Sequence, residues 1–165
     1  KHKYSDGWYV LEDRVLKDLK ENPASRRMVT SLFNHHDLSE MGLYPCAYSM
    51  TFNVSGNTLN AILNQRSQDM LTASNWNVCQ YAVLVHMMAQ VSGLVAGELV
   101  HVIADCHIYD RHVPLVEKLI ERQPRPAPKL WINPEVKNFY DFTVDDFKLE
   151  GYDPWPFDER IEVAI

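Results

Sequence analysis

Two residues of a predicted β-hairpin, Cys46 and Arg66, have the chemistry of a reactive thiol site. The hairpin consists of two β-rich runs, 47–54 and 58–67, joined by a loop at 55–57. With this loop, Cys46 lies opposite Arg66, about 5 Å away at Cβ. A guanidinium beside a thiol favours the thiolate, which is the reactive form. The alternative is that Cys46 packs in the core while Arg66 lies at a sheet edge, because free cysteine is often buried.

Polar side chains in two other segments are candidates for a binding site. Asp105, His107 and Tyr109 alternate along a predicted strand, so we expect all three on one face. They form either the wall of a site or a single buried hydrogen-bond network. Arg26 and Arg27 would face opposite ways in a strand, so that one could bind an anion while the other pairs with an acid. A solvated surface pair is the alternative for these two arginines.

A long apolar segment, residues 78–95, predicts a buried helix. It contains several polar residues and lacks charged flanks, so we do not expect it to span a membrane. The helix begins at Ser74 or Asn75, either of which could cap it, and ends at about Gly93, a residue type that commonly terminates helices. Asn77, near its start, either caps the helix or binds the edge of a base, because its amide both donates and accepts hydrogen bonds.

The other predicted elements mix strands and helices in an order that lacks regular βαβ units, which favours the α+β fold class. No internal repeat, low-complexity tract or Gly/Ser linker divides residues 1–165, so we expect a single domain. The remaining elements are a short helix ending before Asn22, a strand over 28–33, a buried strand over 99–109, a helix from Pro114 to about Arg122, and short strands near Leu130, Phe147 and Glu162.

The composition of the 165 residues is that of a globular protein, with 46% hydrophobic and 23% charged residues. Three cysteines, none in a CxxC pair, argue against a disulfide scaffold or a zinc site and suit a reducing compartment. The net charge of −6 argues against a general nucleic-acid-binding surface. We therefore expect a cytoplasmic protein with no signal peptide, no metal, no nucleic-acid partner and no membrane attachment.

The predicted sheet carries apolar residues on both faces, and each face therefore needs a cover. Few helices are predicted to provide that cover. We expect a subunit interface between two sheets, with Leu32, Leu63, Val100 and Val102 as its candidate residues.

Taken in order, eight segments of the chain resemble the thymidylate synthase family, from about Asn22 to Ile165. The resemblance implies a mixed β-sheet packed with helices and a homodimer that associates sheet to sheet. It also implies the reductive methylation of dUMP to dTMP, with 5,10-methylenetetrahydrofolate as the co-substrate that supplies carbon and hydride. The segments are SRRMVTSLFN, LYPCAY, QRSQDM, NWNVCQYAVLVHMMAQVSG, DCHIYDRH, RPAPKL, NFYDFTVDDFKLEGYDP and EVAI.

The resemblance assigns roles to individual residues. It implies that Cys46 is a nucleophile whose thiolate adds to C6 of the uracil ring. For dUMP it implies binding by Arg66 and Ser67 (phosphate), Asn77 (O4 and N3 of the base), His107 and Tyr109 (ribose 3′-hydroxyl), Asp69, and Arg26 and Arg27, which reach the phosphate in the site of the second subunit. For the reduced folate it implies Leu43, Asp69 and Trp76, with the terminal Val163, Ala164 and Ile165 closing over the ligands.

Three positions depart from the family pattern: Ala47, Thr51 and Ala73 stand where histidine, glutamine and glycine are usual. The chain also lacks roughly the N-terminal third of that pattern. Missing with it are a glutamate that manages proton transfers and the tryptophans of the folate pocket, with which Trp8 does not align. We therefore expect either a piece of a longer enzyme or a degenerate homologue.

Two other functions are open on the sequence alone. A pyrimidine nucleotide hydroxymethylase would use the same thiol adduct, with water in place of hydride meeting the methylene carbon. Asn77 favours uracil over cytosine as the base, since an aspartate would suit a cytosine edge. Outside the enzymes, the alternative is a truncated, non-catalytic nucleotide-binding or dimerisation module.

Overall fold

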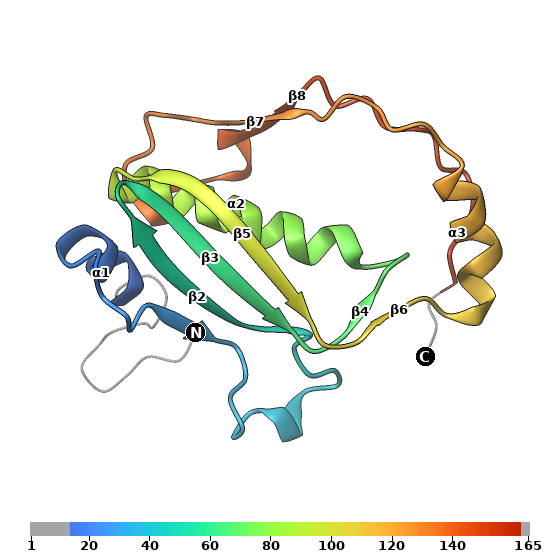
Figure 1. Ribbon diagram of the computed structural model, residues 1–165, viewed down its shortest axis with the longest axis horizontal. Helices are drawn as coiled ribbons and strands as arrows, with labels where there is room; N and C mark the ends of the chain where they lie inside the picture. The colour runs from blue at the N-terminus through green and yellow to red at the C-terminus, as the bar shows by residue number, and fades with distance from the viewer. Residues whose placement is uncertain (1–13, 163–165) are drawn as a thin grey trace.

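The computed structural model describes residues 14–162, and its centre is a mixed four-stranded sheet with a long helix against one face (Figure 1). The strand order is β1-β2-β3-β5; β5 is parallel to β3, and the other pairs are antiparallel. This arrangement confirms the predicted α+β class, although β3, α2 and β5 together form one βαβ connection. The elements of this core are β1 (Val29–Ser31), β2 (Ala47–Ser55), β3 (Thr58–Gln65), α2 (Ser74–Ser92) and β5 (Val95–Ile103).

Smaller elements surround this core (Figure 1). A two-stranded pair, β4 with β6, lies at one end of the sheet, and a second pair, β7 with β8, lies beyond α2. The predicted strands near Leu130 and Phe147 are confirmed. Residues 152–162 form no strand, and the rest of the strand predicted near Glu162 lies outside the described residues. The bounds are α1 (Leu16–Glu21), β4 (Gln68–Asp69), β6 (Cys106–His107), α3 (Val113–Ile120), β7 (Lys129–Ile132), β8 (Phe147–Glu150), and 3₁₀ turns at Leu38–Glu40, Asp110–His112, Phe139–Asp141 and Val144–Asp146.

The β2–β3 hairpin has a two-residue loop, Gly56-Asn57, one residue shorter than predicted. Gly56, the first loop residue, has a φ of 62°, whereas the φ of Asn57 is not positive, since only glycines have a positive φ among the described residues. A positive φ at the first loop residue alone is the pattern of a type II′ turn. The shorter loop shifts the pairing by one residue, and a β-bulge at Tyr48 shifts it back. The amide of Arg66 therefore donates to the carbonyl oxygen of Cys46 at 2.9 Å, so the predicted pairing of these two residues is confirmed.

Helix α2 ends as predicted but begins differently. Gly93, directly after it, has a φ of 71°, and its amide donates to carbonyl oxygens of the last helical turn. At the other end the N-cap residue is Ala73, whose side chain cannot cap, so the predicted capping by Ser74 or Asn75 is wrong. Within residues 14–162 we find no helix whose length and hydropathy suit a membrane crossing.

The hydrophobic core lies between α2 and the sheet face that it covers. Met50 on β2, Leu63 on β3 and Met88 on α2 are all completely buried there, and Phe52 is nearly so. The prediction of Leu63 at a subunit interface is therefore wrong: its place in the strand pairing directs it toward the core of its own chain.

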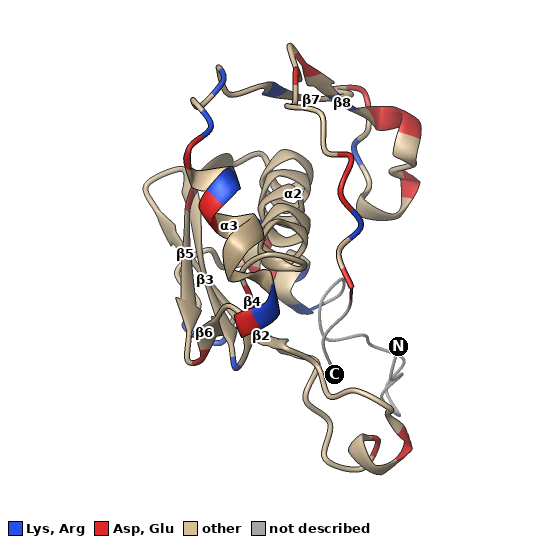
Figure 2. Ribbon diagram, turned by 90° about the vertical axis from the view of Figure 1, so that its right-hand side faces the viewer, with Lys and Arg blue, Asp and Glu red and all other residues tan. Residues whose placement is uncertain are grey.

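No element among residues 14–162 covers the other face of the sheet (Figure 2). Val29, Ile62, Val100 and Val102 lie there and are between 40% and 48% exposed. The buried strand predicted over 99–109 is thus wrong in two respects. Exposed and partly buried residues mix along β5, and the strand starts at Val95 and stops at Ile103, before the separate β6.

Candidate active site

Cys46 lies directly before β2, and its thiol contacts the guanidinium of Arg66, which follows β3. The Nη2 atom of Arg66 donates to the carbonyl oxygen of Tyr44 at 2.7 Å, and Nε donates to that of Pro45 at 3.1 Å. These bonds hold Nη2 at 3.7 Å from Sγ of Cys46, which is partly buried. The predicted contact of the two side chains is confirmed, and a cation so placed can stabilise negative charge on the sulfur.

Several chain segments meet at this end of the sheet. The start of β2, the ends of β3 and β5, the β4–β6 pair and the start of α2 all lie there (Figure 1). Ser67 joins β3 to β4, and Asn77 lies half buried in the first turn of α2. The fold therefore collects the predicted site residues Cys46, Arg66, Ser67, Asp69, Asn77 and His107 at one end of the sheet.

Asp69, at the end of β4, accepts hydrogen bonds from the loop that leads to α2. Its Oδ1 accepts from the amides of Leu71 (2.9 Å) and Thr72 (3.2 Å), and its Oδ2 accepts from the Thr72 hydroxyl. Burial acts to raise the pKa of Asp69, but these hydrogen bonds and nearby His112 outweigh burial and lower it below its ordinary value. Asp69 is therefore an ionised acceptor at neutral pH, held in one orientation.

The predicted cluster of Asp105, His107 and Tyr109 is present. Nδ1 of His107 lies 2.9 Å from Oδ1 of Asp105, and the ring of Tyr109 packs edge-on against the His107 ring at 5.1 Å between centroids. The three residues do not share one strand, however, because β6 ends at His107. In the β4–β6 ladder His107 pairs with Asp69, so this cluster lies beside the Asp69 carboxylate.

His112 is a residue of this region that the sequence patterns did not single out. Its side chain is buried, and its ring packs edge-on against Tyr109 at 5.8 Å between centroids. Nε2 lies 2.9 Å from the carbonyl oxygen of Glu162 and must donate to it, since a carbonyl only accepts. Nδ1 is buried and has no hydrogen-bond partner in the described part of the chain. The three-residue spacing from Tyr109 was the one available signal, because such residues align in a 3₁₀ turn.

The two apolar residues predicted for the folate site are widely exposed. Leu43, three residues before Cys46, and Trp76, in the first turn of α2, are each 77% exposed. Both are large apolar side chains that solvent surrounds in this chain, which makes them available for contact with a ligand.

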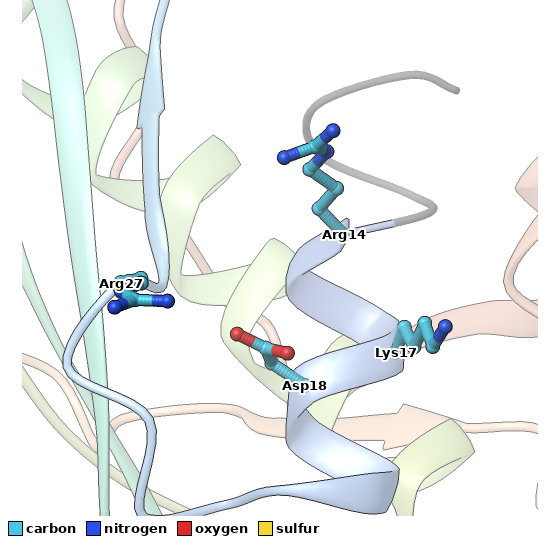
Figure 3. Close-up of a pocket in the computed structure, with 4 residues that line it drawn as sticks. All are labelled: Arg14, Lys17, Asp18 and Arg27. Carbon is cyan, nitrogen blue, oxygen red and sulfur yellow. The ribbon is translucent and has the colours of Figure 1, made fainter. Parts of the chain in front are cut away.

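Arg26 and Arg27 do not join the residues around Cys46. Both are exposed and precede β1 rather than lying in it. Figure 3 shows Arg27 facing Asp18 across a pocket that Arg14 and Lys17 also line, so Arg27 lies beside α1. Val163, Ala164, Ile165 and Trp8 lie outside the described residues. Within 14–162, no group of three or more His, Cys, Asp or Glu side chains could hold a metal ion.

A partly buried thiol held against a guanidinium at one end of a mixed sheet defines a candidate nucleophilic site, and the comparisons with known proteins identify its family. The family model described as thymidylate synthase matches residues 9–165. The chain therefore belongs to the thymidylate synthase family, as its sequence segments predicted.

Relatives and a solved structure agree with this assignment. The chain is 49% identical to the thymidylate synthase of Bacillus mojavensis and 48% identical to thymidylate synthase 1 of Bacillus subtilis (strain 168), each over 140 residues. Each match covers 85% of this chain and 50% of the relative. The structure of thermostable thymidylate synthase A from Bacillus subtilis matches with a TM-score of 0.83 at 47% identity, over 88% of this chain and 53% of that one. The chain thus spans about half the length of the curated relatives it matches.

Proposed function

We propose that this chain supplies the nucleophile and the nucleotide-binding residues of a thymidylate synthase, which converts dUMP to dTMP by reductive methylation with 5,10-methylenetetrahydrofolate. The observation that carries the proposal is the 3.7 Å contact between Nη2 of Arg66 and Sγ of Cys46. Because backbone carbonyls fix the guanidinium, the contact exists before any ligand binds. Family membership supports the same reading.

In the proposed reaction the thiolate of Cys46 forms a bond to C6 of the uracil ring. The electrons of the C5–C6 double bond then move toward the C4 carbonyl, so that C5 becomes a nucleophile. The folate co-substrate supplies the one-carbon unit and the hydride. The chain's own residues hold the nucleotide against Cys46 and keep the thiol ready to add.

The phosphate of dUMP is assigned to Arg66 and Ser67. Two nitrogens of the Arg66 guanidinium are engaged by the hairpin, but Nη1 makes no hydrogen bond within the described residues and can donate to a phosphate oxygen. The adjacent Ser67 hydroxyl offers a second donor. The Arg66 guanidinium would then contact both the phosphate and the thiol of Cys46. It would thereby fix how far the phosphate of the bound nucleotide lies from the sulfur that attacks its base.

The base and the ribose are assigned to residues of α2 and β6. Asn77 offers one donor and one acceptor, which match O4 and N3–H of uracil. Because Nδ1 of His107 donates to Asp105, the other ring nitrogen, Nε2, is the one assigned to the ribose 3′-hydroxyl. Tyr109, packed against His107, offers its own hydroxyl to the same group.

The residues assigned to the folate fit a flat ring with polar edges. Asp69 is an ionised acceptor for ring N–H groups, and it lies next to the ribose residues in the β4–β6 pair. Leu43 and Trp76 offer exposed apolar surface to the faces of such a ring. Ala164 and Ile165 keep their proposed role at the same ligand from the C-terminus.

We also propose a homodimer that associates through the uncovered sheet face. Val29, Ile62, Val100 and Val102 provide its apolar surface, and Leu32 is 57% exposed beside β1. Arg26 and Arg27, which lie apart from Cys46 in their own chain, would reach the phosphate in the second subunit's site. Sedimentation should give a dimer at micromolar concentration and a monomer for Val100→Asp, because a charge would be buried. A monomeric unmodified chain contradicts the shared site.

A cytoplasmic location is proposed on the chemistry of the thiols. Cys46, Cys79 and Cys106 are all free. A reactive thiol that must stay reduced suits a reducing compartment.

The test of the proposed function is covalent trapping with 5-fluoro-dUMP and 5,10-methylenetetrahydrofolate. A base removes the C5 proton of dUMP but cannot remove fluorine from C5, so the adduct stalls while still bonded to the enzyme. Mass spectrometry of the digested chain should then find nucleotide and folate on the peptide that contains Cys46, and none on the peptide with Cys79. Cys46→Ser should abolish the adduct. An unmodified chain that forms no adduct contradicts the proposal.

Product analysis then separates methylation from hydroxymethylation. With dUMP and the reduced folate, we expect dTMP and oxidised folate as the products. Formation of 5-hydroxymethyl-dUMP instead would assign the chain to the hydroxymethylases, because water and not hydride would have met the methylene carbon.

A further inference from the structure

Two glutamines next to the site residues are buried, Gln65 at the end of β3 and Gln68 at the start of β4. Gln65 is 2% exposed and Gln68 is 1% exposed, although each carries an amide that needs hydrogen-bond partners when buried. They flank Arg66 and Ser67 in the sequence. A third polar side chain, His101 on β5, is partly buried and contacts Gln65. The proposed reaction gives none of these three polar side chains a role.

The three side chains form a relay of hydrogen bonds whose direction is fixed. Nε2 of Gln68 lies 3.2 Å from the carbonyl oxygen of Asp69 and therefore donates to it. Nε2 of Gln65 donates to the carbonyl oxygen of Ser67 at 2.8 Å and to Oε1 of Gln68. The Oε1 atom of Gln65 is thus left as an acceptor, so Nε2 of His101, 2.9 Å away, must donate to it.

The relay ends where the parallel strand pairing is interrupted, between β3 and β4. The chain pairs with β5 up to Gln65 and with β6 from Gln68, so residues 66–67 lie outside both ladders. The relay binds the carbonyl oxygens of Ser67 and Asp69, one on each side of Gln68. Ser67 lies outside both parallel ladders, and the relay therefore supplies a fixed contact to its carbonyl oxygen, while the contact to Asp69 holds the start of β4.

We propose that His101 is a positioning residue, which acts through Gln65 to hold segment 66–69 in the conformation that the active site requires. The inference rests on the proposed function for the importance of that segment. Without the His101 donor, Oε1 of Gln65 is buried with no partner, and the amide must reorient to find one. Reorientation releases the carbonyl oxygen of Ser67 and lets the segment move, which displaces the neighbouring guanidinium from Cys46.

The protonation state of His101 agrees with this role. Burial lowers the pKa of His101, so the ring is neutral at pH 7. A neutral ring that donates from Nε2 has a lone pair on Nδ1, and a single tautomer is therefore expected. Nitrogen-15 chemical shifts of the His101 ring report that tautomer directly in the unmodified chain. A ring protonated on Nδ1 alone would overturn the relay.

The main test measures thiol reactivity, which requires neither nucleotide nor folate. Each cysteine's rate of alkylation by iodoacetamide is followed by mass spectrometry, with the exposed Cys79 on α2 as internal standard. His101→Leu should lower the alkylation rate of Cys46 relative to Cys79 by about threefold or more. The reason is that the displaced Arg66 guanidinium no longer stabilises the thiolate, which is the reacting form. His101→Gln, which can still present an N–H to Gln65, should retain most of that rate. The matched control is Leu99→Ala, a loss of core packing on the same strand that leaves the relay intact.

The outcomes separate positioning from stability and from the proposed function. The free energy of unfolding of each variant is measured by urea titration. If Leu99→Ala slows Cys46 as much as His101→Leu does, or if His101→Leu leaves the rate unchanged, the positioning role is overturned. Trapping with 5-fluoro-dUMP is run on the same samples. An unmodified chain without an adduct contradicts the proposed function, while the alkylation ratio and the ring tautomer still decide the role of His101.

Discussion

The two ends of the β2–β3 hairpin are built in different ways. At the loop end, Gly56-Asn57 closes a regular ladder of paired residues that begins at Ser55 and Thr58. At the other end the bulge at Tyr48 interrupts the ladder. There the side chain of Arg66 connects the two strands through hydrogen bonds to backbone carbonyl oxygens. The conformation of the loop end is determined by residues adjacent in the sequence, whereas that of the bulged end depends on contacts between residues about 20 positions apart.

The difference identifies the reactive end without reference to any relative. A bulge, a bound guanidinium and buried glutamines each depart from the simplest strand pairing, and all three occur at the end of the sheet that holds Cys46. Departures of this kind concentrate at functional sites, because regular pairing alone would not aim a side chain at a ligand. The following variants test whether the loop end and the hairpin body carry stability while the bulged end carries chemistry.

The largest expected effect is on stability, from Phe52→Ala in the body of the hairpin. Phe52 is 2% exposed in the core, and its loss should lower the free energy of unfolding by about 3–5 kcal/mol, as for other buried aromatic residues. Urea titration measures the change. Asn53→Ala, on the exposed face of the same strand, is the control and should change it by less than about 0.5 kcal/mol. Similar losses in both variants would contradict the assignment of the core face.

At the bulged end, Arg66→Met should affect ligand binding more than stability. Removing the guanidinium is expected to weaken dUMP binding by about ten- to a hundredfold, because charge-assisted hydrogen bonds contribute about 1.5–3 kcal/mol. Titration calorimetry measures the affinity. Arg122→Met is the control, since Arg122 bonds to the carbonyl oxygen of Pro156 in an exposed segment. If the Arg66→Met chain binds dUMP as tightly as the unmodified chain does, the assignment of the phosphate to Arg66 is contradicted.

At the loop end, Gly56→Ala should lower the free energy of unfolding by about 1–2 kcal/mol, because an alanine is strained at the positive φ of this turn. The adduct with 5-fluoro-dUMP should form at an unchanged rate. Gly42→Ala is the matched control: its φ is not positive and no atom lies within 4 Å of the added Cβ, so no loss is expected. A slower adduct in Gly56→Ala would show that the two ends of the hairpin are coupled.

The smallest expected effect is a pH dependence from His101. Because its folded-state pKa lies below the ordinary value of 6.5, the unfolded chain binds the proton first as the pH falls. As the pH decreases from about 6.5 to the folded-state pKa of His101, this residue therefore lowers the free energy of unfolding. Above about pH 6.5 it contributes no pH dependence. Urea titrations at several pH values measure the slope, and His101→Gln should reduce it. An equal slope in that variant would assign the pH dependence to other groups.

Local chemistry explains which parts of the fold were predictable. The hairpin, the end of α2 at Gly93 and the start of α3 beside Pro114 all follow from residues with special backbone preferences. The face of Leu63 was predicted incorrectly, because β3 carries apolar residues on both faces and the strand alone does not show which face α2 covers; Ile62, which pairs with Val100, lies on the open face instead. The bulge at Tyr48 could not be read from the sequence, since it depends on the partner strand.

The site divides in the same way. Cys46 and Arg66 were predicted to meet because a hairpin brings their positions together, and the bulge happened to compensate the error in the loop. The hydrogen bonds of His101 and His112 were not predictable, because their partners lie 36 and 50 residues away along the chain. No local pattern marks a polar side chain whose partner is set by the packing of distant segments.

The most direct test of the central claim is whether Cys46 adds to C6 of dUMP. Addition makes C5 basic, so the hydrogen at C5 should exchange with solvent even without folate. Proton NMR of dUMP in deuterated water should therefore show the C5–H signal decaying in the presence of the chain and persisting with Cys46→Ser. A signal that decays equally slowly with both proteins would contradict the role of Cys46 as the nucleophile.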